Sequence, residues 1–450
     1  MVLTRLGGLR RSFPTLRLMA APFRWIVKSR RRVWCVVLIL LWMVTAPPLW
    51  WATQLMGLPD IGDPFDVEAF RAKTIPDDRN AFVLYRQAVA LYKPLKWSDT
   101  SASLPVDLHT RWLTAVPDVR RWAEVNREAL AVYRRGADRP DALDSSTTSR
   151  GGFVEFDALR PFQRLALLEA SRLEDQSDPA GAWGWYLTYL RTIHHVGLYG
   201  MRYRRMAAQK WHDQLRLRLT DWAADARTTS AQLHRALGDV IACEMLVPSD
   251  SYTLNAEYLY MAQRLVGSNN LGRLIPLPWL GAIKSFALDL TPEQKRSISE
   301  AWRFWRREPE RSWRVIRLVA ANRLAYYDLP PDQRPSPDAN IWSRDLYPFG
   351  PEAPAKARVL SPAALGRWID SSRDAQELIG VLNLRGLRIK ELANDRALVI
   401  LLETELYRRD HKTDPPTPEA LVGPYLKSLP IESPDDERGG ADPKAAARAD

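Results

Sequence analysis

The stretch DPAGAWGWYLTYLRTIHHVGLY, from Asp178 to Tyr199, indicates the fold class of the chain. Asp178 is a favourable helix N-cap, and Pro179 suits the first helical turn because proline lacks an N–H that this turn leaves unpaired. The residues that follow show none of the strict apolar and polar alternation of a half-buried strand. We therefore expect a helix that ends near Tyr199.

Helical patterns also dominate on both sides of this segment. The connections within the block 153–246 are short, so its helices should pack as antiparallel neighbours. Strand patterning is nearly absent, and no fixed repeat period recurs. The predicted fold class is all-α, with an irregular antiparallel helical domain behind one N-terminal transmembrane helix. The expected helices run over about 76–93, 117–136, 153–174, 178–199, 202–224, 230–246, 291–309, 311–328 and 373–411, while 249–290 is mixed.

An apolar segment near the N-terminus is long enough to cross a membrane. No charged side chain lies between Val33 and Pro59, and about 20 apolar residues suffice for a spanning helix. Residues 33–56 are thus predicted to form a transmembrane anchor. Basic residues precede it and acidic residues follow it, which predicts a single-pass inner-membrane protein with its N-terminus in the cytoplasm and its C-terminal domain outside.

Both ends of this segment carry residues that favour a membrane interface. Basic and indole side chains suit the headgroup region. Two alternatives stay open for the segment itself, a cleaved signal peptide and an apolar helix outside the membrane. The basic residues 5–32 either lie on anionic headgroups or form a disordered arm that only sets the topology. The expected interface residues are Arg30, Arg31, Arg32, Trp34, Trp50 and Trp51.

Charge is concentrated in the N-terminal arm. The net charge is 64 − 53 = +11, and residues 1–32 contain nine basic residues and no acidic one. The rest of the chain carries 11 − 9 = +2, so charge gives no reason to expect a nucleic-acid partner. The two cysteines, Cys35 and Cys243, form neither a disulfide framework nor a zinc motif. The expected organisation is a basic cytoplasmic arm at 1–32, the anchor at 33–56, an outward-facing helical domain at 60–328, a proline-rich linker at 329–362, a long helix with a C-terminal module at 363–434, and a disordered tail at 435–450.

The sequence contains no standard catalytic motif, so the catalytic residues stay unknown and no cofactor is expected. His194 and His195 are adjacent and point about 100° apart on a helix, so they cannot form an i, i+4 metal pair, and no metal site is predicted. His212 and Asp213 supply a general base and an orienting carboxylate only if another helix brings them together. Otherwise they are ordinary surface or interhelical residues.

Aromatic and arginine residues are the remaining candidates for binding. Tryptophan and tyrosine stack on sugar rings and occupy interface hot spots, although interhelical packing also explains them. Arg204 and Arg205 follow Tyr203, an arrangement that suits either an anionic ligand or a solvated face with cation–π contacts. The aromatic residues expected to line a glycan or peptide groove are Trp183, Trp185, Tyr186, Tyr189 and Trp211.

The tract from Asp395 to Pro430 has a distinctive arrangement. A helix ends at His411, prolines turn the chain, and a short second helix with Leu421, Tyr425 and Leu426 packs back on the first. This tract resembles a C-terminal module of uncharacterised membrane-anchored bacterial cell-envelope proteins and, more distantly, the region after the helix in type II secretion pseudopilins. It departs from them at Lys412, where glycine is usual. The resemblance implies a cell-envelope protein and carries over no catalytic residue.

These observations favour a membrane-anchored cell-envelope protein whose helical domain binds other envelope components. The expected partners are the lipid bilayer and envelope proteins or glycans, with no nucleic acid. The sequence identifies no reaction. Two alternative functions stay open, a glycan-active hydrolase with an α/α-type domain and an accessory component of a secretion or assembly system.

Overall fold

A computed structural model describes residues 60–95, 110–144, 157–272, 308–327 and 384–422, together with scattered positions between 31 and 49. The chain divides into two compact units. One consists of Met1–Asp60 and Arg264–Arg314, and the other of Ile61–Gln263 and Val315–Asp450. The second unit contains the helical domain.

The regular secondary structure of the described residues is helical and includes no strand, which confirms the predicted all-α class. An isolated β-bridge joins Asn80 and Asp141. The helices are α3 (Val67–Ala72), α4 (Ala81–Leu91), α5 (Pro117–Val125), α6 (Arg127–Ala137), α8 (Arg160–Asp175), α9 (Pro179–Leu198), α10 (Arg202–Ala224), α11 (Ser230–Cys243), α12 (Asp250–Gly272), α14 (Glu308–Tyr327), α17 (Arg385–His411) and the 3-10 helix η9 (Pro418–Leu421).

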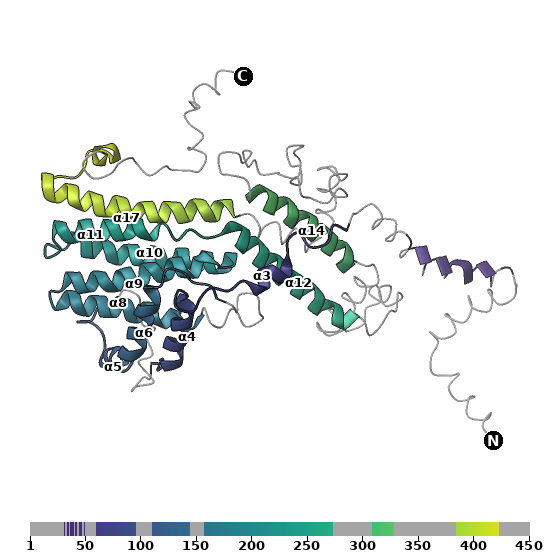
Figure 1. Ribbon diagram of the computed structural model, residues 1–450, viewed down its shortest axis with the longest axis horizontal. Coiled ribbons are helices and arrows are strands. Elements are labelled where there is room, and N and C mark those ends of the chain that lie inside the picture. Colours follow the sequence, from purple (N-terminus) through teal and green to yellow (C-terminus); the bar gives the residue numbers. More distant parts are fainter. Residues whose placement is uncertain are drawn as a thin grey trace, which may run out of the picture. The chain divides into compact units, whose positions relative to one another are not determined.

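Helices α8, α9, α10, α11 and α17 form a bundle, in which α17 packs on α10 and α11 (Figure 1). Consecutive helices from α8 to α11 are antiparallel, as their short connections predict. In contrast, α17 runs parallel to α10. Arg205 pairs with Glu391 near the start of both helices, and Arg409 donates to the Ala223 carbonyl at their other end.

Local capping signals set the helix ends. The Asp178 carboxylate accepts a hydrogen bond from the Gly181 N–H at 2.8 Å, so α9 begins where the sequence predicts. Thr229 and Gln232 form a capping box at the start of α11. These bonds satisfy N–H groups that have no partner within their own helix. Lys412 takes a left-handed conformation with φ 59° and ends α17 directly after His411.

Helix α17 shares the main hydrophobic core of the bundle. Leu398, Leu402 and Leu406 lie on one face of α17 and are fully buried in that core. Leu421 of η9 is buried in it too, so the short helix packs back as expected, whereas Tyr425 and Leu426 lie outside the described residues. The proline-rich stretch 329–362, which is also outside them, therefore does not divide the chain into two separate cores.

The helix predicted over 117–136 is interrupted at Asn126. This buried side chain accepts a hydrogen bond from the Lys93 N–H and donates to the carbonyls of Lys93 and Trp122. The contacts hold the end of α4 at the boundary between α5 and α6. At Gly136, a Cβ atom would lie 2.8 Å from the Tyr85 ring, so glycine allows α4 and α6 to approach closely.

Two other expectations need correction. Residues 249–290 were expected to be mixed, yet α12 covers Asp250–Gly272. Most residues from Tyr252 to Met261 are buried, and a helix buried over most of its surface shows only a weak amphipathic period. Pro309 was expected to end a helix, but it lies in the first turn of α14, where proline is tolerated. Residues 291–307 lie outside the described residues.

Within the described part of the chain, no helix is long and apolar enough to cross a membrane. The predicted anchor, residues 33–56, is described only at scattered positions, and each of these is helical. Arg31 and Trp34 are among the described residues and are exposed. The remaining predicted interface residues, Arg30, Arg32, Trp50 and Trp51, lie outside them.

Candidate functional site

The five aromatic residues expected to line a groove are buried in the core instead. Their exposed fractions are at most 9%. The Trp183 ring stacks on Trp222 at 5.1 Å, and its indole N–H donates to Asp239 at 2.8 Å. These large rings fill the space between helices, as the interhelical-packing interpretation predicts. The prediction that they line a groove is therefore wrong. The residues concerned are Trp183, Trp185, Tyr186, Tyr189 and Trp211.

Arg204 and Arg205 of α10 are likewise buried and do not form a solvated face. Arg204 is 3% exposed and pairs with the buried Asp144 at 2.6 Å. Arg205 is fully buried and pairs with Asp250 and Glu391, each at 2.7 Å. Burial of a guanidinium is tolerated only when carboxylates and hydrogen bonds compensate for the lost water. These two arginines are therefore interhelical contacts.

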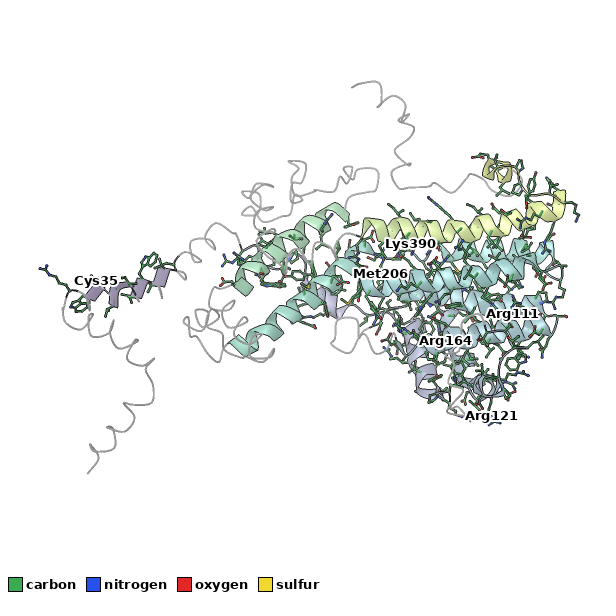
Figure 2. All side chains as sticks on the ribbon, turned by 180° about the vertical axis from the view of Figure 1, so that it is seen from behind. Cys35, Arg111, Arg121, Arg164, Met206 and Lys390 are labelled. Carbon is green, nitrogen blue, oxygen red and sulfur yellow. The ribbon has the colours of Figure 1, made fainter. Side chains whose placement is uncertain are left out.

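The most unusual arrangement of polar side chains joins α17 to α9 and α10. Three residues of α10 at helical spacing face α17. In Figure 2 the label Met206 marks α10 and the label Lys390 marks α17. We call this arrangement the polar seam. It consists of His194 from α9, Arg205, Gln209 and His212 from α10, and Glu391 and Asp395 from α17.

One end of the polar seam is held by strong hydrogen bonds. The Arg205 guanidinium donates to both carboxylate oxygens of Glu391, at 2.8 and 2.7 Å. Burial lowers the pKa of Arg205, but the two carboxylates outweigh burial and hold it above its ordinary value. The Gln209 amide donates to the Leu387 carbonyl at 2.9 Å. A bidentate arginine–carboxylate pair fixes the relative position of two helices more strictly than a single contact.

At the other end, one carboxylate oxygen lies between two imidazoles. Asp395 Oδ1 is 3.6 Å from His194 Nε2 and 3.4 Å from His212 Nε2. His212 is 3% exposed, and neither of its ring nitrogens has a hydrogen-bond partner among the described residues. Burial lowers the pKa of His194, Asp395 opposes this effect, and His212 adds to it. The carboxylate near His212 is thus Asp395, while Asp213 lies 3.8 Å from Lys390.

Two imidazoles and one carboxylate are side-chain types that bind metal ions in proteins. The described residues include no group of three His, Cys, Asp or Glu side chains placed to hold a metal ion. Because burial lowers the pKa of His194 in the folded protein, this histidine contributes stability at neutral pH that is lost as the pH falls.

A second buried histidine, His195, should make the stability of the domain depend on pH in acid. His195 is 1% exposed, and its Nδ1 lies 2.8 Å from the Tyr85 hydroxyl. Burial, together with the charge of neighbouring His194, lowers the pKa of His195 to about 3. A lowered pKa means that the unfolded chain binds the proton more tightly, so this contribution to stability is lost as the pH falls below about 6.5.

We expect the His195→Asn variant to lose stability less steeply in acid than the natural protein. Folded and unfolded pKa values of about 3 and 6.5 correspond to a loss of about 3 kcal/mol between pH 7 and pH 4. Asparagine keeps a polar atom near Tyr85 and removes the titration. Urea unfolding of the detergent-purified full chain, followed by circular dichroism, measures the change. The control is His234→Asn at an exposed site, and equal acid slopes for both variants would argue against a titrating His195.

Comparison of the chain with family models, with curated proteins and with solved structures finds no match.

Proposed function

We propose that this chain is a single-pass membrane-anchored protein whose helical domain, outside the cytoplasm, binds a protein component of the cell envelope. The anchor is residues 33–56, with the basic arm before it on the cytoplasmic side. Asp60, Asp63 and Asp66 follow the charge-free stretch, and this asymmetry supports the orientation. The likeness of the C-terminal tract to envelope proteins agrees with this compartment.

The observation that carries the proposal is the charge-free stretch Val33–Pro59, whose described positions are helical. Trp34, Leu38 and Leu49 expose 65%, 57% and 65% of their surface. The Thr45 hydroxyl donates to the Leu41 carbonyl at 2.8 Å, so its polar group is satisfied within the helix. A helix with about 20 mostly apolar residues is more stable in the hydrocarbon of a bilayer than in water.

The binding surface we propose lies at the end of α11. Ile241, Met245 and Val247 are close together in the sequence and expose 47%, 82% and 49% of their surface. Exposed apolar side chains that gather in one patch mark contact sites for other proteins, and methionine adapts its shape to a partner. Because the aromatic residues first expected to bind a partner are buried, we propose the end of α11 as the contact surface instead.

A crosslinking experiment tests this function. A photoreactive residue at position 245 in the membrane-bound full chain should give one discrete crosslinked species, identified by mass spectrometry as an envelope protein. The same probe at Leu217, which is 50% exposed on α10, should not give it. The species should disappear in an Ile241→Ser variant. Identical products from positions 245 and 217 would contradict a specific contact at α11.

A further inference from the structure

The outer side of α11 carries one stripe of exposed residues. The opposite side of this helix is buried against α17 and α9 (Figure 1). Positions three, four and seven residues apart share one face of a helix, and the exposed positions of α11 follow this spacing. We call them the α11 stripe: Ala231, His234, Arg235, Gly238, Ile241, Ala242 and, directly after the helix, Met245.

The two ends of the α11 stripe differ in side-chain size. Ile241 and Met245, at its C-terminal end, expose 47% and 82% of their surface. Ala231, at the other end, has a small side chain. A Cβ atom at Gly238, between them, would meet no atom within 4 Å outside its own part of the helix. The stripe therefore has a bulky apolar end and a shallow end, with an open position in the middle.

These two ends fit each other when two copies of α11 pack antiparallel. Met245 lies seven residues after Gly238 and Ala231 lies seven residues before it, which is about 10 Å along the helix in each direction. A two-fold axis at Gly238 would thus place Met245 of one copy against Ala231 of the second copy. The large side chain would cover the small one, and the missing side chain at Gly238 would let the two backbones approach closely.

The charges on this side of α11 agree with the same arrangement. Arg235 is exposed, and Asp239, one turn later, lies along the same edge of the stripe. Across the two-fold axis, Arg235 of each copy would lie within about 3 Å, measured along the helix, of the level of Asp239 in the other copy. The Trp183 indole N–H donates to Asp239 at 2.8 Å, and a carboxylate accepts further hydrogen bonds. An antiparallel pair would therefore form two identical arginine–aspartate contacts.

From this match in size and charge we propose that the partner bound at the end of α11 is a second copy of this chain. The two α11 stripes pack antiparallel about a two-fold axis at Gly238. Such an interface uses the same surface patch on both chains, so the patch must be complementary to itself. This inference rests on the proposed function for its contact surface and adds the identity of the partner.

Disulfide formation between two differently tagged copies tests this arrangement. Both full chains carry Cys35→Ala and are produced together in the membrane, one with Met245→Cys and the other with Ala231→Cys. Cys243 stays in place because it is buried. Mild oxidation should give a disulfide-linked dimer that contains both tags. Either chain alone should give at least fivefold less dimer, because its two new cysteines would be about 21 Å apart, and a disulfide joins Cα atoms less than about 7 Å apart.

A charge reversal tests the arginine–aspartate contacts. Arg235→Glu in both chains should reduce the mixed dimer at least threefold, because a like charge then faces Asp239 of the second copy. Arg216→Glu is the matched control at an exposed position of α10 and should leave the mixed dimer unchanged. An equal loss in both variants would contradict a specific contact at Arg235.

The outcomes separate this inference from the proposed function. If the mixed chains form no more dimer than either chain alone, the antiparallel second copy is wrong. The photoreactive residue at position 245 then decides the proposed function. A discrete species that contains a different envelope protein leaves that function standing, whereas the absence of any discrete species overturns both.

Discussion

Replacing Arg205 with methionine is expected to lower the free energy of unfolding by about 3 to 5 kcal/mol. The fully buried guanidinium bonds to Glu391 on α17 and to Asp250 and Thr253 on α12. Methionine fills part of the same volume but leaves two carboxylates mostly buried without their cation. The attachment of α17 should weaken first, because Glu391 lies near the start of that helix.

An exposed ion pair provides the control for this prediction. Arg111 and Asp221 are 2.5 Å apart, with side chains 46% and 57% exposed. Arg111→Met should therefore cost about 1 kcal/mol or less, since water screens such pairs. Urea unfolding of both variants in detergent, followed by circular dichroism, gives the two free energies. Equal small losses would show that the polar seam does not hold α17.

Replacing Glu403 with glutamine is expected to stabilise the protein, and more so in alkali. Glu403 of α17 is fully buried, and neither carboxylate oxygen has a partner among the described residues. Burial raises its pKa to about 8. The folded protein thus holds the proton more tightly than the unfolded chain, and the resulting stability is lost as the pH rises from about 4.5 through 8.

The size of this effect follows from the two pKa values. With about 4.5 unfolded and about 8 folded, the gain from Glu403→Gln should be about 4 kcal/mol larger at pH 9 than at pH 5. Glu405→Gln is the matched control on the same helix, because Glu405 pairs with Arg408. Both variants are compared with the natural protein by urea unfolding at the two pH values. A gain from Glu403→Gln that is independent of pH would mean that the buried carboxyl stays ionised.

The sequence predicts helices where local interactions set their ends. The range of α10 agrees with the expected 202–224, and α9 begins after its predicted cap at Asp178. Long-range contacts decide the remaining features. Asn126 interrupts a regular helical pattern because it bonds to Lys93, 33 residues away. Burial of most residues from Tyr252 to Met261 weakens the apolar and polar periodicity by which α12 would be recognised as a helix.

The candidate site was not predictable from neighbouring residues. Arg205 and Glu391 are 186 positions apart, so no local motif joins them. One signal was present, since Arg205, Gln209 and His212 repeat at the spacing of one helix face. Polar residues at such spacing usually form a solvated face, and only the packing of α17 shows that this face is buried. The aromatic residues were expected to line a groove, but they are buried because large rings fill a helical core.

The membrane orientation of the domain is tested most directly by labelling cysteines from one side of the membrane. The full chain with Cys35→Ala carries one new cysteine, at Leu217 in the domain or at Arg10 in the basic arm. An impermeant maleimide added to intact cells, after the outer barrier is opened, should label position 217 at once. It should label position 10 only when the inner membrane is broken. Labelling of position 10 in intact cells, with position 217 protected, would contradict the proposed orientation.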